Sequence, residues 1–327
     1  MNGITFDYPT DSEFYSKMYR TLVESELNDF VIITHARPDG DTVGSGFALA
    51  YILRLTGKNA RAVCFDPIPE KYGYITDIEV PDFTAKNAVT VDVASPALIG
   101  GEVELPIVCA IDHHVKNTVD APEKFVKGNK GACGEIIFEF AVYCGIQFDT
   151  YLAKCLYTAI ATDTGCFKYE AVTEYTYLAA AYLSRYIPRD EAAKINLTHF
   201  DTKTLKQIRI ENYAMENMHM YFCDTVGICV ITDEIKEKFG ATDEELECMS
   251  SLARQIETVE SSFSIKQKEG GICKISLRTK EYVDAALFCS HFGGGGHVRA
   301  AGCTIEGTPE EAENKIIEMY RKTIIQR

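Results

Sequence analysis

Short apolar runs in the first half of the chain repeatedly lead into acidic or imidazole side chains. Three such runs are Phe30–Thr34, Val89–Val91 and Ile107–Ile111. Runs of this length that are rich in Val and Ile are typical of strands buried on both faces of a sheet. Because the carboxyl ends of parallel strands meet at one sheet edge, the groups that follow these runs are predicted to converge. The first residues after the three runs are His35, Asp92 and Asp112.

Helix-like stretches alternate with these strands. Apolar residues recur at helical spacing in Val43–Leu55, Cys133–Tyr143 and Tyr151–Ala161, and Ala60–Phe65 adds another strand-like run. This alternation predicts an α/β fold with a mainly parallel sheet flanked by helices.

The second half of the chain follows a different pattern. The segment Tyr175–Asn217 has the spacing of successive helices and lacks strand signals. Strand-like runs return beyond it, and a last helix is expected near residues 309–325. We therefore expect an N-terminal α/β domain over residues 1–188, a helical connector over 189–217 and a smaller α+β domain over 218–327. The expected strands of this smaller domain are 218–223, 226–231, 261–267 and 272–277.

Charge and cysteine content exclude several classes of protein. The net charge of −15 argues against sequence-independent binding to a long nucleic-acid backbone, which needs many Lys and Arg contacts. No apolar run approaches the roughly 18–20 residues of a membrane-spanning helix, and the N-terminus lacks a signal-peptide pattern. The 12 cysteines include no C-x-x-C pair and mostly stand in apolar runs, so reduced, buried thiols are expected. We therefore expect a soluble cytoplasmic protein.

The densest group of potential metal ligands is the segment His35-x-x-x-Asp39-x-Asp41. The turn at Gly40 can bring both carboxylates toward one point, where a divalent cation would offset their repulsion. Asp163 adds another carboxylate in an otherwise apolar neighbourhood. Each feature also has an ordinary interpretation, as a turn residue, a core histidine or a helix cap. Their joint occurrence at predicted strand ends favours a metal-binding site.

These residues resemble the four motifs of the DHH phosphoesterase superfamily. Near the other end of the chain, four glycines and His297, followed by Ala300-Ala301-Gly302, resemble the Gly-Gly-Gly-His signature of the associated DHHA1 domain. The resemblance spans residues 35 to 302 and implies an N-terminal DHH domain, a helical connector and a C-terminal DHHA1 domain. The four N-terminal motifs are His35-Ala-Arg-Pro-Asp39-Gly-Asp41, Asp92, Asp112-His113-His114 and Asp163-Thr-Gly165.

The resemblance implies a centre for two metal ions. Oxygen and imidazole ligands without thiolate suit Mn²⁺, with Mg²⁺ as the alternative. Two such ions would activate a water for attack on phosphorus. His114 would face the substrate, and Asp112 would orient a neighbouring histidine. The implied ligands are His35, Asp39 and Asp92 for one ion, and Asp41, Asp92, His113 and Asp163 for the other.

The resemblance also implies that the C-terminal domain binds substrate. Arg278 matches the Ser-x-Arg segment by which relatives grip a terminal phosphate, although Thr279 stands where the family often has Ser. A solvated arginine and a flexible glycine loop are the ordinary alternatives. The backbone N–H groups of the glycine segment and the histidine after it would contact a phosphate or a nucleotide. The residues of this segment are Gly294, Gly295, Gly296 and His297.

The length and the pairing of both domains are most similar to NrnA-type nanoRNases, which also dephosphorylate 3′-phosphoadenosine 5′-phosphate. The expected function is therefore metal-dependent hydrolysis of short oligoribonucleotides and of that nucleotide. The alternatives are a phosphodiesterase for the linear dinucleotide pApA, a manganese inorganic pyrophosphatase and a non-catalytic nucleotide-binding module. Expected partners are short RNA or small nucleotides, without long duplexes or membranes. The sequence leaves open whether the chain forms a homodimer.

Overall fold

The chain forms two compact units, Met1–Thr202 and Lys203–Arg327. A computed structural model describes residues 11–80, 82–243, 245–246 and 248–325. The first unit is an α/β layer structure and the second holds a mixed sheet, which confirms the predicted fold class. The predicted boundaries of the two domains and the helical connector, after residues 188 and 217, stay a prediction. Each unit is described by itself below.

The sheet of the first unit is entirely parallel. Its strand order is β2-β1-β3-β4-β5. Four of the strands match the apolar runs of the sequence, whereas β5 is an edge strand with one fully buried position and was not predicted. The strands are β1 Phe30–Ile33, β2 Ala60–Val63, β3 Asn87–Val91, β4 Ile107–Asp112 and β5 Glu123–Val126.

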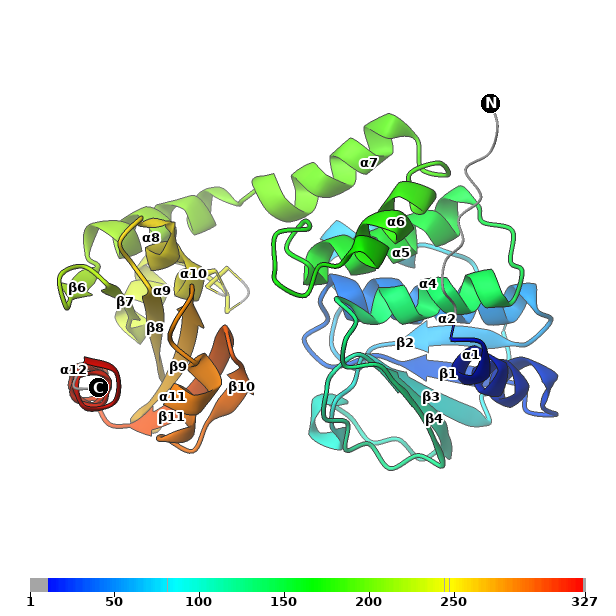
Figure 1. The fold of residues 1–327 in the computed structure, drawn as a ribbon, viewed down its shortest axis with the longest axis horizontal. Coiled ribbons are helices and arrows are strands. Elements are labelled where there is room, and N and C mark those ends of the chain that lie inside the picture. The colour runs from blue at the N-terminus through cyan, green and yellow to red at the C-terminus, as the bar shows by residue number, and fades with distance from the viewer. Residues whose placement is uncertain (1–10, 81, 244, 247, 326–327) are drawn as a thin grey trace. The chain divides into compact units, whose positions relative to one another are not determined.

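Helices cover one face of this sheet, as Figure 1 shows. Side-chain caps start several of them, because an unpaired N–H at a helix start needs an acceptor. Asp39 accepts from Thr42 N at the start of α2, and Asp149 accepts from Leu152 N at the start of α5. The helices are α1 Ser12–Tyr19, α2 Gly40–Leu55, α3 Gly73–Thr76, α4 Cys133–Tyr143, α5 Thr150–Asp163, α6 Glu174–Leu183 and α7 Arg189–Asn196.

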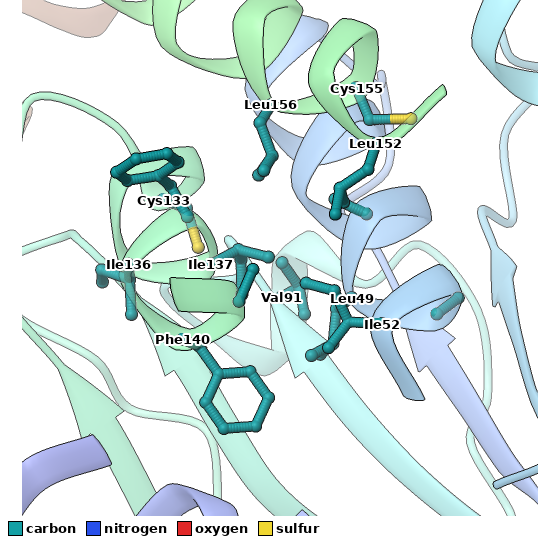
Figure 2. Packing of buried hydrophobic residues seen from close by; sticks show 14 of the residues in the cluster. Leu49, Ile52, Val91, Cys133, Ile136, Ile137, Phe140, Leu152, Cys155 and Leu156 are labelled. Carbon is teal, nitrogen blue, oxygen red and sulfur yellow. The ribbon is translucent and has the colours of Figure 1, made fainter. Parts of the chain in front are cut away.

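The main core of this unit lies where α2, α4 and α5 meet the sheet. Figure 2 shows Leu49 of α2, Ile137 of α4 and Leu156 of α5 gathered near Val91 of β3. Each such fully buried aliphatic side chain contributes about 1.5–3 kcal/mol. The helices approach closely at Gly44, where an added Cβ would lie 2.4 Å from a backbone oxygen of α5. Loop side chains around residues 98–121 cover the opposite face.

The second unit is built on a sheet of strand order β10-β11-β9-β8-β7-β6. Only β7 and β8 pair in parallel; the other neighbours are antiparallel. The predicted hairpin around residues 218–231 is confirmed as β6 and β7. The strands are β6 His219–Tyr221, β7 Val226–Ile231, β8 Ser261–Lys268, β9 Ile272–Thr279, β10 Gly295–His297 and β11 Ala300–Glu306.

Helices pack on this sheet to close a second core. Thr308 and Glu311 form a reciprocal capping box at the start of the last helix, which fixes where that helix begins. The helices are α8 Leu205–Glu216, α9 Asp233–Phe239, α10 Met249–Leu252, α11 Ala285–Ser290 and α12 Pro309–Tyr320. In the described part of the chain, no helix has both the length and the apolar character that a membrane span requires. All 12 cysteines carry free thiols, and Cys223 alone is exposed.

Candidate metal centre

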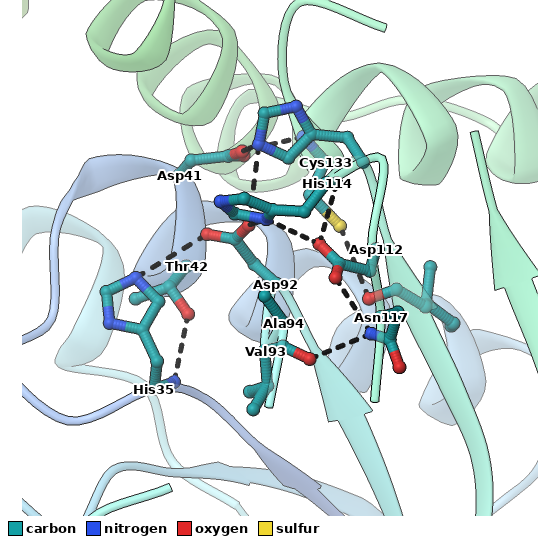
Figure 3. Close-up of polar contacts among 12 residues, drawn as sticks. His35, Asp41, Thr42, Asp92, Val93, Ala94, Asp112, His114, Asn117 and Cys133 are labelled. Carbon is teal, nitrogen blue, oxygen red and sulfur yellow. Dashed lines mark hydrogen bonds and ion pairs between the residues drawn. The ribbon is translucent and has the colours of Figure 1, made fainter. Parts of the chain in front are cut away.

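Acidic and imidazole side chains of the first unit converge at the carboxyl edge of its parallel sheet. His35 follows β1, Asp92 follows β3, and Asp112 is the last residue of β4. Figure 3 shows His35, Asp41, Asp92 and His114 turned toward one another. His113 follows β4 directly. Helix ends deliver the rest: Asp39 and Asp41 stand at the start of α2, and Asp163 ends α5. The structure therefore brings together all six residues that the sequence marked as metal ligands.

The imidazole nitrogens stand at a common spacing from the carboxylate oxygens. His35 Nε2 lies 3.5 Å from Asp39 Oδ2 and 3.6 Å from Asp92 Oδ2. His113 Nε2 lies 3.7, 3.6 and 3.3 Å from oxygens of Asp41, Asp92 and Asp163. Two ligands that each lie about 2.1 Å from one shared ion are roughly 3–3.5 Å apart. The spacing therefore suits ligands gathered around cations.

Asp92 occupies the middle of this arrangement. Its carboxylate contacts both His35 and His113, and its side chain is only 3% exposed. Its backbone has a φ of 58°, which is uncommon for any residue other than glycine. Among the described residues, its buried Oδ1 has no hydrogen-bond donor. A buried carboxylate oxygen without a donor is costly, and a cation at this position would satisfy it.

The pKa shifts within the cluster also favour a bound cation. Burial, together with the neighbouring Asp92 and Asp163, raises the pKa of the Asp41 carboxyl well above its usual range. Burial also raises the pKa of Asp163, to about 7, against the opposing effect of His113. Burial lowers the pKa of His35, but the carboxylates of Asp39 and Asp92 outweigh it and raise that pKa to about 11. Buried carboxylates that repel one another are stable together once a divalent cation balances their charge.

The start of α4 holds Asp41 in place. The backbone N–H groups of Cys133 and Gly134 donate to its two carboxylate oxygens at 2.6 and 2.9 Å, and Ser45 Oγ donates to Oδ1 at 2.8 Å. A helix start favours negative charge because its N–H groups point outward. Gly40 is required beside it, because an added Cβ would lie 2.3 Å from Thr162 Oγ1. These supporting residues carry no metal-ligand signature, so the sequence did not reveal them.

A second support holds His113 through the backbone of Lys130. His113 Nδ1 lies 3.1 Å from the Lys130 carbonyl oxygen, so this nitrogen carries the proton and Nε2 faces the carboxylates. The Lys130 ammonium is paired with the buried Glu139, whose other oxygen accepts from Tyr15 Oη at 2.5 Å. The same ammonium lies 3.9 Å from the buried Glu135. Sequence reasoning missed this network, because its contacts join residues that are 5 to 124 positions apart.

His114 is oriented by Asp112. Asp112 Oδ1 accepts from His114 N at 3.1 Å and from His114 Nδ1 at 2.8 Å (Figure 3). Asn117 Nδ2 donates to the other oxygen of Asp112 at 2.8 Å and to the Val93 carbonyl at 2.9 Å. Asn117 thus ties Asp112 to the residue after Asp92, and it was not identified from the sequence. With Nδ1 committed to Asp112, Nε2 is the ring nitrogen that can serve a substrate.

Three ligand sets emerge from these positions. One of them, His35 with Asp39 and Asp92, has the same members as the first set that the resemblance implied. Another, Asp41 with His113 and Asp163, contains the members of the second implied set except Asp92. In the third, Asp92 and His113 are joined by His114. The hydrogen bond from His114 Nδ1 to Asp112 competes with ligation through that nitrogen. Within each set the ligand atoms lie within 4.8 Å of one another, close enough to bind one ion. Their oxygen and imidazole donors suit hard or borderline divalent cations.

The predicted substrate-binding residues lie in the second unit. Arg278 of β9 pairs with Ala300 of β11, and Ala300 pairs on its other side with His297 of β10. Residues that pair across neighbouring strands share one face of the sheet. Arg278 and His297 therefore flank the small side chain of Ala300, and His297 is exposed.

The glycine segment is more regular than a flexible loop. Gly295 and Gly296 pair with β11, so part of the segment continues the sheet as β10. Gly296 has a φ of 148°, and an added Cβ would lie 2.5 Å from the Ala300 oxygen. Gly294 is as tight, with an added Cβ 2.2 Å from the Gly302 oxygen. Glycine is needed at both positions because another strand passes directly against the backbone.

Two protein-family models match this chain. The DHH family, N-terminal domain, matches residues 29–160, and the DHHA1 domain matches residues 226–326. The first span contains every predicted ligand except Asp163, and the second contains Arg278 and the glycine segment.

Several curated proteins are similar over most of their length. The bifunctional oligoribonuclease and PAP phosphatase NrnA of Thermus thermophilus is 28% identical over 302 residues, covering 90% of this chain and 89% of that protein. The NrnA of Bacillus subtilis is 27% identical over 301 residues, covering 89% and 93%. A probable NrnA of Streptococcus mutans is 26% identical over 316 residues, covering 93% and 97%.

Solved structures share the fold. An exopolyphosphatase-related protein of Bacteroides fragilis superposes with a TM-score of 0.81 at 22% identity, covering 95% of this chain and 97% of that one. RecJ of Thermus thermophilus in complex with Mn²⁺ gives a TM-score of 0.50 at 10% identity, covering 98% of this chain and 55% of that one.

Proposed function

Because the chain belongs to the DHH family of phosphoester hydrolases and carries a DHHA1 domain, we propose that it hydrolyses short oligoribonucleotides and 3′-phosphoadenosine 5′-phosphate. The observation that carries this choice is the similarity to NrnA proteins along nearly the whole of both chains. The net charge of −15 supports a short substrate, because a long nucleic-acid backbone needs an extended basic surface.

The proposed cofactors are two Mn²⁺ ions, with Mg²⁺ as the alternative. His35, Asp39 and Asp92 would hold one ion; Asp41, Asp92, His113 and Asp163 would hold the other. When bound, such ions lower the pKa of a water and offset negative charge on the phosphoryl oxygens. Asp92 Oδ1, which accepts no hydrogen bond from the described residues, and the crowded carboxylates around it support this assignment.

His114 would act on the substrate directly. Its Nδ1–H is fixed on Asp112, so its Nε2 would hydrogen-bond a phosphoryl oxygen or deliver a proton to the leaving oxygen. The hydrogen bond to Asp112 raises the pKa of His114, which favours the protonated form that such a transfer needs. Asp112 stays ionised because its bonds from His114 and Asn117 outweigh the effect of burial and lower its pKa. In this role Asp112 is a positioning residue.

The second unit would bind the rest of the substrate. The Arg278 guanidinium would grip a terminal phosphate, a contact that is strong because both partners are charged. His297 and the backbone N–H groups near Gly294–Gly296 would add polar contacts to the nucleotide. The small Ala300 stands between Arg278 and His297 on that face of the sheet.

A linear dinucleotide such as pApA is the second candidate substrate. The cyclic-di-AMP phosphodiesterase PdeA of Listeria monocytogenes is 23% identical over 320 residues, although this span is only 47% of that protein. A chain of this build would take the linear dinucleotide as another short phosphodiester.

A parallel hydrolysis assay tests these assignments. The purified protein with Mn²⁺ is given RNA of two to five nucleotides, 3′-phosphoadenosine 5′-phosphate, pApA and pyrophosphate, and the products are separated by chromatography. We expect cleavage of the short RNA and release of phosphate from 3′-phosphoadenosine 5′-phosphate. Cleavage of pyrophosphate alone would refute the substrate choice, and turnover of none of the four would refute the proposed function.

A further inference from the structure

The segment that follows Asp163 carries aromatic side chains at the border of the metal centre. Tyr169 is 53% exposed and Tyr177 of α6 is 55% exposed. Neighbouring exposed aromatic rings can mark a ligand-binding surface, and both tyrosines lie within 14 residues of Asp163 in the sequence. Neither residue has a role in the metal centre or in the proposed substrate contacts of the second unit.

Tyr169 is held close to the metal centre by a compact turn. The backbone N–H groups of Lys168 and Tyr169 both donate to the Thr164 oxygen, at 2.9 and 3.1 Å. The Tyr169 ring then lies so near Gly165 that an added Cβ there would be 2.4 Å from a ring carbon. Gly165 is two residues from Asp163, which limits their Cα separation to about 7.6 Å. One exposed ring therefore lies within a short reach of a predicted metal ligand.

Tyr177 is held as firmly. Its ring stacks on Phe167 with 5.8 Å between centroids and 26° between planes, and its hydroxyl donates to the Phe167 oxygen at 3.3 Å. Phe167 in turn packs against the main core, where its ring lies 6.3 Å from that of Tyr157. The Tyr177 ring is thus fixed on its inner side, while more than half of the side chain is open to solvent.

The backbone of this turn is strained. Cys166 and Phe167 have φ values of 56° and 63°, a region that L-residues rarely adopt and that is unusual for a bulky aromatic. Such conformations cost about 1–3 kcal/mol each and persist where the surrounding structure or the function requires them. At Phe167 the result of the strain is to place a ring beneath Tyr177.

We propose that Tyr169 and Tyr177, with Phe167 beneath Tyr177, form a platform on which a nucleobase of a single-stranded substrate stacks. Flat faces of exposed aromatic rings bind bases of any sequence, as in proteins that hold single strands. Lys168, which directly precedes Tyr169 in the sequence, is exposed and supplies a positive charge for the adjoining phosphate. The occupant is therefore a base with its phosphate, and the platform would position the phosphodiester at the metal centre.

This inference rests on the proposed function, because it names a base-bearing single strand as the substrate of the same site. It adds a binding site in the first unit to the contacts proposed for the second. It also predicts a preference for substrates that carry bases over those that carry only phosphate and sugar.

The test replaces each ring in two ways. Tyr169→Leu and Tyr177→Leu remove the aromatic face and keep apolar bulk, whereas Tyr177→Phe keeps the ring. Tyr282→Leu is the matched control, since Tyr282 is 65% exposed and lies in the second unit. The substrates are an RNA trinucleotide and the same trinucleotide without bases.

The platform predicts a selective effect on KM. Losing one stacked base raises KM for the trinucleotide about tenfold in the leucine variants, with kcat within about twofold. Tyr177→Phe and Tyr282→Leu keep the wild-type KM, and the abasic substrate is bound equally by all variants. Equal KM values for wild type and both leucine variants, or equal losses on both substrates, would overturn the platform.

A fluorescence measurement separates this inference from the proposed function. The protein has no tryptophan, so the fluorescence of a 2-aminopurine trinucleotide can be followed without interference after rapid mixing with the Mn²⁺-loaded protein. Stacking quenches that fluorescence in wild type and Tyr177→Phe and leaves it unquenched in the leucine variants. Quenching without hydrolysis would reject the proposed function and retain the platform, whereas equal signals in all variants would reject the platform.

Discussion

Asp112 Oδ1 accepts two hydrogen bonds from His114, one from its backbone nitrogen and one from Nδ1 at 2.8 Å. This pairing fixes both the proton and the direction of the imidazole ring. It also separates Asp112, which orients a histidine, from the carboxylates that are predicted to bind metal. Asp112 contacts a histidine and an asparagine, whereas Asp92 offers an oxygen that meets no donor among the described residues.

Asp112→Asn should therefore impair turnover without removing metal. The amide would present an N–H group either to His114 or to the Nδ2 donor of Asn117, so one of the two contacts is lost. We expect kcat to fall about 10–100-fold, as for other residues that orient catalytic imidazoles. Metal analysis by mass spectrometry should give the same Mn²⁺ content as wild type. Loss of metal together with activity would mean that Asp112 acts as a ligand.

Lys130→Met should destabilise the first unit strongly. The change leaves Glu139 and Glu135 buried without their ammonium partner, which costs about 3–5 kcal/mol in comparable buried pairs. Lys154→Met is the matched control, because Lys154 pairs at 2.9 Å with Glu191, whose side chain is 40% exposed, and such pairs contribute at most about 1 kcal/mol. Urea denaturation of the metal-free proteins measures both. Equal losses in the two variants would contradict the importance of the buried network.

His199 should make the first unit sensitive to acid. Burial, aided by the nearby Lys71, lowers its pKa to about 4, and its Nε2 lies 2.8 Å from Tyr74 Oη. The unfolded chain binds a proton on this histidine below about pH 6.5, while the folded chain does so only near pH 4. The contribution of His199 to the free energy of unfolding is therefore complete above pH 6.5. It falls as the pH drops toward 4, by at most about 3 kcal/mol.

The variant His199→Gln isolates this effect. Glutamine keeps a hydrogen-bond partner for Tyr74 and does not titrate in this range. Urea denaturation between pH 7 and pH 4 should show a steeper loss of stability in wild type than in the variant. Parallel pH curves would exclude His199 as the cause.

Arg278→Ala should weaken substrate binding and leave the metal centre intact. Losing a charged contact to a terminal phosphate is expected to raise KM at least about tenfold, with kcat changed less. Arg321→Ala serves as the control, because Arg321 is an exposed cation at the end of α12. Steady-state kinetics on a short RNA, with Mn²⁺ content measured in parallel, check the prediction. A fall in Mn²⁺ content would contradict the separation of metal and substrate contacts.

The fold class could be predicted because its determinants are local. The strands β1, β3 and β4 are short, nearly continuous apolar runs, a pattern that parallel strands covered on both faces must have. The strand β5 escaped prediction since three of its four residues are only partly buried or exposed, as expected at a sheet edge. The pairing of Gly295–His297 escaped it for another reason, because glycine has low strand propensity and the partner strand supplies the order.

The candidate site was predictable only for residues whose side-chain type itself indicates a role in metal binding. Carboxylates and imidazoles after strands predict where cations can bind, and the structure places those residues within reach of one another. Lys130 escaped prediction because it supports His113 through a backbone carbonyl, which any residue type provides. The Tyr169 and Tyr177 rings escaped it because the sequence does not show which tyrosines are buried in a core and which are exposed.

The number of Mn²⁺ ions bound by Asp92→Asn tests the central claim most directly. Asparagine tolerates the left-handed φ of this residue and preserves its volume, so the fold should be kept. Calorimetric titration should give two ions for wild type and for Asp112→Asn, and a loss of tight binding at both positions in Asp92→Asn. The metal-free Asp92→Asn protein should melt no lower than metal-free wild type, because a buried carboxylate that repels its neighbours is gone. Two tightly bound ions in Asp92→Asn would contradict a centre in which Asp92 joins the two sites.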